Sequence, residues 1–334
     1  MAVKAGALRF NTDSNKLELY DGNQWVEIVA TSPEAQTGGT RGVFHEGYIA
    51  PVRSNVLSYV NVSTTGNAVD FGDLTQGRSS TGGLSSSTRG VIGGGYLDPA
   101  SQGTIDYITI SSTGNAISFG SLSVTRDTPG ACSNSTRGIW GGGSPGPATS
   151  NVIDYVTIAS TGNAVDFGDL TVTRTGLRGS GNATRGLFFG GSPLTNVIDF
   201  ITISTLGNAA DFGDLTQTKV DANGCSNSTR TIIAGGYNPT PSLVQYNVIE
   251  FLTIATLGNA QDFGDLNQKR TSTDALASST RGLFGGGYDG PSPAVRFNII
   301  DYVTIMSAGN AIDFGDLLNT CSSGTGLSNG HGGL

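Results

Sequence analysis

A nine-residue pattern, Gly-Asn-Ala-x-x-Phe-Gly-x-Leu, recurs along this chain of 334 residues and constrains its fold more than any other feature. A second pattern, Thr-Arg, recurs in step with the first, and an alternating segment such as Val152–Ile158 lies between the two. Such a period indicates one small unit that is copied and stacked, because a single unit cannot bury its own apolar face. The six copies of the first pattern begin at Gly66, Gly114, Gly162, Gly207, Gly258 and Gly309, and those of the second have their arginine at Arg41, Arg89, Arg137, Arg185, Arg230 and Arg281.

Each copy predicts four short strands separated by turn signals. In the second copy these strands span residues 82–87, 90–94, 105–110 and 116–122. The composition favours an all-β fold, because glycine, at 51 residues, suits tight turns and is costly inside helices. Four strands per repeat are typical of a propeller blade, so we expect a six-bladed β-propeller with four strands per blade.

The repeat spacing predicts how the ring closes. Successive Thr-Arg arginines are 48, 48, 48, 45 and 51 residues apart, and the loop between the second and third strands absorbs all of this variation. The last copy then supplies only a first strand, at about residues 323–329, whereas the first copy begins at its second strand with Arg41. We therefore expect the C-terminal strand to pair with the N-terminal blade, which removes an exposed sheet edge.

The strand order, with Gly-Gly ending the second strand at Gly93-Gly94, Gly141-Gly142 and equivalent positions, resembles a kelch repeat. It departs from that family where Phe167-Gly168 stands in place of the usual tryptophan. Residues 36–334 more closely resemble repeat proteins of tailed phages that infect marine cyanobacteria, which carry strings like Ser-Thr-Arg-Gly-Leu-Phe-Gly-Gly-Gly and Asn-Val-Ile-Asp-Tyr-Val-Thr-Ile. This resemblance implies a virion protein of the mature particle, of fibre, neck or decoration type.

The first part of the chain lies outside the repeats. Residues 7–29 alternate apolar and polar side chains around two turn segments, which predicts a small β-meander. We divide the chain into this module, residues 1–36, and the propeller, residues 37–334. A meander this short holds no core of its own, so it is expected to dock on the propeller, on another copy or on another protein. It resembles modules common in phage tail and fibre proteins, which implies attachment to other virion proteins within a larger assembly.

The chain offers little catalytic chemistry. Its two histidines, His45 and His331, suggest at most a structural pair at the ring closure, and its three cysteines are expected to be small core residues. A net charge of −8 argues against nucleic acid, and the sequence contains no run of 18 apolar residues that would indicate a membrane helix. Glycosidase and copper-oxidase patterns are missing from the sequence. We therefore expect a protein that is not an enzyme and uses no cofactor, metal or catalytic residue.

Charged residues that recur in every repeat are interpreted as structural. The Thr-Arg arginines are expected to be largely buried between strands and bonded either to the repeated aspartates or to backbone carbonyls. Those aspartates are Asp73, Asp169, Asp214, Asp265 and Asp316.

A binding surface is predicted where the repeats differ. Every change in length falls in the loops between second and third strands, which emerge on one face together with the loops that join successive repeats. The fifth and sixth of these loops are the longest, and aromatic side chains in them suit a protein partner or a sugar. The candidate residues are Tyr237, Pro239, Pro241, Tyr246, Tyr288, Pro291, Arg296 and Phe297. The expected function is structural or adhesive, in a virion; the alternatives are a lectin-type propeller that binds host-surface glycan and a propeller glycan hydrolase.

Overall fold

The computed structural model describes residues 3–11, 16–27, 40–291 and 294–332. The chain divides into two compact units, residues 1–35 and 36–334. Every regular element in the described residues is a strand, so the all-β prediction is confirmed. The described part of the chain contains no helix of the length and apolarity needed to cross a membrane.

The second unit contains five antiparallel sheets of four strands and one of five strands. We number them as sheets 1 to 6, each with its strands in spatial order from the first to the fourth. Sheet 1 is β34 (Thr325–Ser328), β4 (Arg41–His45), β7 (Val56–Asn61) and β8 (Val69–Asp73), and sheet 2 is β9 (Gly82–Ser85), β10 (Arg89–Gly93), β13 (Thr104–Thr109) and β14 (Ile117–Ser121). Sheet 3 is β15 (Gly130–Ser133), β16 (Arg137–Gly141), β17 (Val152–Thr157) and β18 (Val165–Asp169), and sheet 4 is β19 (Arg178–Gly181), β20 (Arg185–Phe189), β21 (Val197–Thr202) and β22 (Ala210–Asp214). Sheet 5 is β23 (Asn223–Ser226), β24 (Arg230–Ala234), β27 (Val248–Thr253) and β28 (Gln261–Asp265), and sheet 6 is β29 (Asp274–Ala277), β30 (Arg281–Gly285), β32 (Val295–Thr304) and β33 (Ile312–Cys321), with β31 (Tyr288–Asp289) on the extension of β32.

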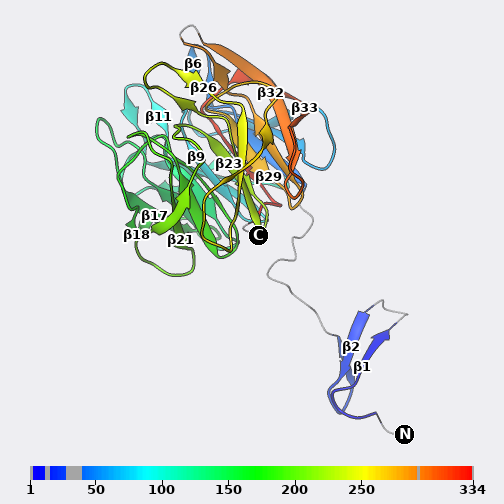
Figure 1. Ribbon diagram of the computed structural model, residues 1–334. Coiled ribbons are helices and arrows are strands. Elements are labelled where there is room, and N and C mark those ends of the chain that lie inside the picture. Colours follow the sequence, from blue (N-terminus) through cyan, green and yellow to red (C-terminus); the bar gives the residue numbers. More distant parts are fainter. Residues whose placement is uncertain (1–2, 12–15, 28–39, 292–293, 333–334) are drawn as a thin grey trace. The chain divides into compact units, whose positions relative to one another are not determined.

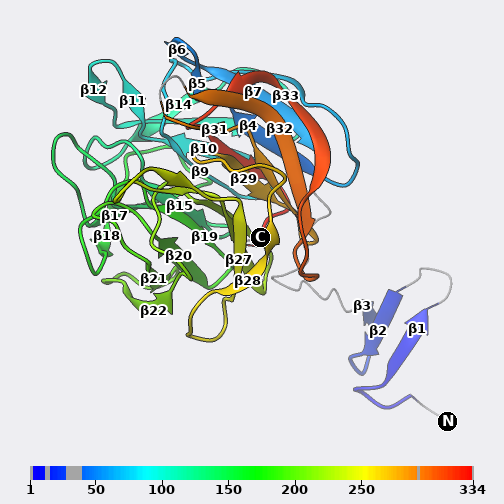
Figure 2. The same ribbon diagram turned by 45° about the horizontal axis from the view of Figure 1, so that its top comes forward.

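The first strands of these sheets contact one another in cyclic order. Strand β9 contacts β15, the contacts continue through β19, β23 and β29 to β34, and β34 contacts β9. Figures 1 and 2 show the sheets of this unit from two directions. Each sheet therefore has one neighbour on either side, and its inner strand belongs to a shared central layer.

The pairing of β34 with β4 confirms the predicted junction between the two ends of the repeat region. The two strands are antiparallel, with Thr325 opposite His45 and Ser328 opposite Gly42. Sheet 1 therefore takes one strand from the end of the chain and three from near its beginning. The inner edge of β4 is covered as a result, as it is in every other sheet.

The apolar core lies between neighbouring sheets. One cluster, for example, joins Leu84, Ile105 and Phe119 of sheet 2 to Trp140 and Val156 of sheet 3. All three cysteines are unpaired and buried in such interfaces, as predicted; burial raises the pKa of the thiols of Cys132 and Cys225 to about 12.

Large and small side chains face each other across these interfaces. A Cβ on Gly93 would lie 2.8 Å from the ring of Trp140, and one on Gly141 would lie 2.9 Å from Phe188. Where a phenylalanine, Phe189, occupies the glycine position, the partner across the interface is the smaller Ile233. Close packing requires this compensation, because overfilled cores are strained.

The loops between second and third strands have structure of their own. Short hairpins form within three of them, from β5 (Tyr48–Ile49) and β6 (Val52–Arg53), β11 (Tyr96–Leu97) and β12 (Ala100–Ser101), and β25 (Tyr237–Asn238) and β26 (Val244–Gln245). The first residue of each loop also bridges to the segment that precedes a first strand, as in the pair formed by Ser79 and Tyr96. The two sets of loops therefore share one face, as predicted, and we call it the loop face.

The first unit is a three-stranded antiparallel sheet of β1 (Leu8–Asn11), β2 (Lys16–Tyr20) and β3 (Trp25–Glu27), as predicted. Arg9 on one side pairs with Glu18 and stacks on Trp25. The strand register places only apolar side chains on the opposite side, which we call the apolar face. Its residues are Leu8, Phe10, Leu17, Leu19 and Val26, and four of these, all except Leu19, are 40–61% exposed.

Removal of residues 321–334 is predicted to make the protein aggregate. The deletion takes away β34 and leaves the inner edge of β4 without a partner, and an unpaired apolar edge invites pairing with other chains. Size-exclusion chromatography and thermal melting should show loss of the monodisperse species and of the cooperative transition. A chain that lacks only residues 333–334 is the control. A truncated protein with an unchanged elution volume and melting temperature would contradict the role of this pairing.

Candidate binding face

The six Thr-Arg arginines join neighbouring sheets, but not through aspartate. Each is half-buried and lies over an aromatic ring of its own sheet, as Arg137 lies 5.0 Å from the ring centre of Tyr155. Each also donates a hydrogen bond to a backbone carbonyl of the next sheet, as Arg137 does to Ile203 at 2.9 Å. The last of them, Arg281 of sheet 6, donates to Val62 and Ser63 of sheet 1. The carbonyl prediction is therefore confirmed, while the arginines are less buried than expected and the aspartate partner is wrong.

The repeated aspartates instead act through their backbone. The N–H of Asp169 donates to the side-chain oxygen of Asn208 in the next repeat, and the carbonyl of Asp169 accepts a bond from Ala209. Ser121 replaces the aspartate in one copy and makes the same bond, to Asn163 at 3.1 Å. A carboxylate is therefore unnecessary at this position. The bonds that correspond to that of Asp169 are made by Asp73, Asp214, Asp265 and Asp316.

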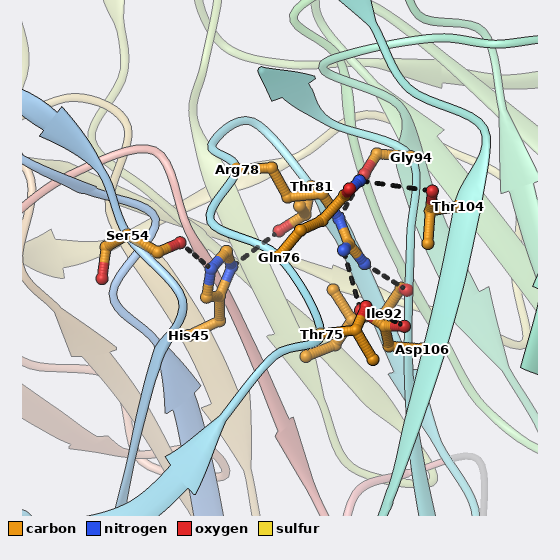
Figure 3. Close-up of polar contacts among 10 residues, drawn as sticks. All are labelled: His45, Ser54, Thr75, Gln76, Arg78, Thr81, Ile92, Gly94, Thr104 and Asp106. Atoms are coloured by element: carbon orange, nitrogen blue, oxygen red, sulfur yellow. Dashed lines mark hydrogen bonds and ion pairs between the residues drawn. The ribbon is translucent and has the colours of Figure 1, made fainter. Parts of the chain in front are cut away.

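Buried ion pairs, which were not predicted, occupy the core of five sheets. Figure 3 shows the one in sheet 2, where the Arg78 guanidinium lies 2.8 Å from the Asp106 carboxylate and also donates to the carbonyls of Ile92 and Gly94. Burial lowers the pKa of Arg78, and the charge of Asp106 opposes that shift. An acidic residue in the middle of the apolar third strand of each of these five sheets was the signal for these pairs. The equivalents are Arg126–Asp154, Arg174–Asp199, Lys219–Glu250 and Arg270–Asp301.

Sheet 1 lacks this ion pair. Cys321 and Ser58 stand at the positions of the arginine and the aspartate, and the side chain of Glu46 lies nearby. The Glu46 carboxylate accepts bonds from the Ser58 hydroxyl at 2.7 Å, the Asn319 amide at 2.9 Å and the Leu318 N–H at 3.1 Å. Burial raises the pKa of Glu46, and these three bonds partly offset the shift. The sheet that joins the two ends of the repeat region is thus held by a different polar network.

The two histidines do not form the suggested pair. His45 lies at the end of β4 opposite Thr325, whereas His331 follows the other end of β34 and contacts the Ser85 carbonyl at 2.8 Å. The ring nitrogens of His45 contact the Thr81 hydroxyl and the Ser54 carbonyl (Figure 3). Among the described residues, no cluster of three or more histidine, cysteine, aspartate or glutamate side chains is placed to hold a metal ion.

Residues 331 and 332, which follow β34, contact the inner strands on the side away from the loop face. These strands enclose a narrow cavity of about 60 Å³. His331 contacts Ser85 of sheet 2, and the N–H of Gly332 donates to the carbonyl of Ser226 in sheet 5 at 2.9 Å. Because these contacts reach two different sheets, the tail ties sheet 2 to sheet 5 at this end of the cavity.

On the loop face, a backbone ring surrounds the centre. The residue two positions before each first strand has a φ of 49–63°. This is a left-handed conformation that residues other than glycine adopt at an energetic cost. Five hydrogen bonds link these residues in order around the centre; in the sixth interval the hydroxyls of Thr128 and Thr175 are in contact. The ring gives the loop face a rigid middle. Its members are Ser80, Thr128, Gly176, Asp221, Ser272 and Ser323.

The candidate residues of the fifth and sixth loops lie on this face with differing exposure. Pro239, Pro241 and Pro291 are exposed. Tyr237, Tyr246, Tyr288, Arg296 and Phe297 are half-buried, which is less exposed than their loop positions suggested. Burial, reinforced by the charge of Asp221, raises the pKa of Tyr237 to about 12.

Three of the candidates line a groove that crosses three loops. Tyr288 and Pro291 come from the sixth loop, and they meet Leu243 of the fifth loop and Tyr48 of the first. Arg296, which was expected in the sixth loop, lies in the first part of β32 and pairs with Tyr288. Together with Gly290 and Ala294, these residues enclose about 530 Å³. A bond from the N–H of Gly290 to the side chain of Gln245 fixes the sixth loop to the fifth. Sequence comparison between loops did not suggest Tyr48, because the first loop is of ordinary length.

No family model matches the chain, and no curated protein matches it.

Replacement of Arg126 by methionine is predicted to destabilise the protein more than replacement of Arg137. Arg126→Met leaves the fully buried Asp154 carboxylate without its cation, at a cost of about 3–5 kcal/mol. Arg137→Met removes one bond to a carbonyl at a half-buried site, at a cost of about 1–3 kcal/mol. Urea unfolding measures both. Equal decreases in the free energy of unfolding of the two variants would contradict the prediction that the buried ion pair matters more.

His45 is predicted to make the protein acid-sensitive. Burial lowers its pKa to about 3, so it stays neutral in the folded protein while it gains a proton near pH 6.5 when unfolded. Stability from this site is complete above pH 6.5 and is lost as the pH falls toward 3, by about 3 kcal/mol between pH 7 and pH 4. His45→Gln, which keeps a donor and an acceptor, should reduce that loss and leave the slope between pH 7 and pH 9 unchanged. The free energy of unfolding of the parent and of His45→Gln is measured against pH. An equal decrease in both proteins between pH 7 and pH 4 would contradict the prediction.

Proposed function

We propose that this chain is a non-enzymatic structural or adhesion protein of a phage virion, in which the six sheets are the blades of a closed, kelch-like β-propeller. The cyclic contacts of the inner strands and the pairing of β34 with β4 support the propeller. The repeated polar residues support a structural role for the ring, because their bonds run from each sheet to the next. The virion assignment rests on the resemblance of the repeats and of the N-terminal meander to phage proteins.

The groove on the loop face carries the binding part of the proposal. It lies where the repeats differ most in length, on loops fixed by hairpins, backbone bridges and the central backbone ring. A rigid, concave surface with aromatic and charged side chains loses little conformational entropy on binding, and such surfaces favour recognition. We therefore assign recognition of a partner protein or a host-surface ligand to this face.

The meander supplies the attachment. Its apolar face exposes large side chains such as Leu8 and Phe10, which are 61% and 59% exposed. A contiguous apolar surface on so small a sheet suits burial against another protein. We propose that other virion proteins cover it within a larger assembly. A second candidate function is a lectin-type propeller, which the aromatic and charged side chains that line the groove favour.

Two changes are predicted to separate the two roles. Shortening the fifth and sixth loops to the five-residue form of residues 192–196 should abolish binding to host cells and leave the protein on the particle. Phe10→Asp should remove it from the particle and leave the fold intact, because the charge cannot be buried against an apolar partner. Gln24→Asp, which adds the same charge at an exposed position just before β3, is the control.

Immunogold labelling of particles and a pull-down on host cells measure these effects. If both variants still attach to particles and cells as the parent does, the proposed function is wrong.

A further inference from the structure

Two arginines of the loop face stack on one tyrosine. The guanidinium carbons of Arg53 and Arg296 lie 4.8 Å and 4.6 Å from the ring centre of Tyr48. Arg53 comes from the first loop and Arg296 from the first part of β32, so the stack crosses the junction between sheets 1 and 6. Cation–π contact favours both positions and holds each guanidinium in place.

The two charges are compensated differently. Arg53 lies 3.3 Å from the Asp98 carboxylate and donates to the Ser79 hydroxyl at 3.1 Å. Arg296 donates from Nε to the Ser322 hydroxyl at 3.4 Å, and no carboxylate of the described residues lies within ion-pair distance of it. Its terminal nitrogens therefore remain available for an anion.

Arg296 lines the groove together with apolar residues. Leu243, Pro291 and Ala294 are among the residues around its space of about 530 Å³. Tyr288 also lines the groove, and a tyrosine hydroxyl is both a hydrogen-bond donor and an acceptor. The volume falls within the roughly 300–1,000 Å³ of small-molecule sites.

We propose that this groove binds an acidic saccharide, with the carboxylate of a uronic acid residue held by Arg296. A planar guanidinium binds a carboxylate through two parallel N–H···O bonds. The C–H face of the sugar ring would pack on Leu243 and Pro291, and its hydroxyls would bond to Tyr288. The inference rests on the proposed recognition role of the loop face and adds its ligand class.

The net charge of the whole chain does not help the groove to attract an acid. With a net charge of −8, the protein as a whole repels anions at long range, so selection of an acid must come from Arg296 itself. A compact groove beside rigid loops also fits a sugar better than an acidic peptide, since protein interfaces bury about 800 Å² per partner over a broader surface.

Isothermal titration calorimetry on the full chain at pH 7 tests the inference with three probes: a trisaccharide of galacturonic acid, a trisaccharide of galactose, and triglutamate. We expect the uronic acid probe to bind at least about tenfold more tightly than the other two, since a buried charge pair contributes strongly when one partner is removed. Arg296→Gln should abolish this preference. Arg53→Gln, the matched control that also stacks on Tyr48 but does not line the groove, should change the affinity by less than about threefold.

Thermal melting confirms that each variant is folded, and Arg296→Lys, which keeps the charge but loses the fork, should recover only part of the affinity. The inference is wrong if the parent binds neither sugar, binds both equally, or prefers triglutamate, or if Arg296→Gln binds as the parent does. If the sugar experiments fail while loop shortening still abolishes attachment to host cells, the acidic-sugar assignment falls and the proposed recognition face stands.

Discussion

The pairing of β34 with β4 is the interaction on which the rest of this unit depends. The four main strands of every other sheet come from one continuous stretch of the chain, but sheet 1 forms only when segments about 280 residues apart meet. Once they meet, Arg281 of sheet 6 reaches the carbonyls of sheet 1, and the N–H of Asp316 reaches Asn67. The same inter-sheet bonds then occur all the way around. Without the pairing, two sheets would each expose an apolar face that is otherwise buried.

The buried charged residues of the interior differ between sheets. Buried arginine and aspartate recur in four sheets, and sheet 5 exchanges them for Lys219 and Glu250, in which a shorter cation meets a longer acid. Sheet 1 replaces the pair with the network around Glu46. A buried charge without a partner is costly, so both members must change together. Sheet 1, the sheet completed last in the chain, is therefore chemically distinct from the others.

The period of the repeat was enough to predict the strands, their antiparallel order and the junction of the two ends, because spacing alone determines which strand lacks a partner. Side-chain roles were harder to predict. Asp169, which recurs in most repeats, was interpreted as the partner of a Thr-Arg arginine, yet its backbone N–H bonds to Asn208. The aspartate that does form a buried ion pair is Asp154, in the middle of an apolar strand, and its partner is Arg126. The left-handed ring had no sequence signal, since serine, threonine or aspartate replaces glycine at five of its positions. The groove could be predicted only in part, because Tyr48 reaches it from a loop distant in sequence.

Hydrogen exchange of the native protein tests the central claim most directly. If β34 completes a continuous ring, its amides should exchange only on global unfolding, as slowly as those of β9, β15 and the other inner strands, despite lying near the end of the chain. The protection of these amides should also fall together, and their exchange rates should rise together, as denaturant is added. Exchange of the β34 amides that is orders of magnitude faster than that of β15 would show that the terminal strand frays independently and would contradict a ring held closed by this pairing.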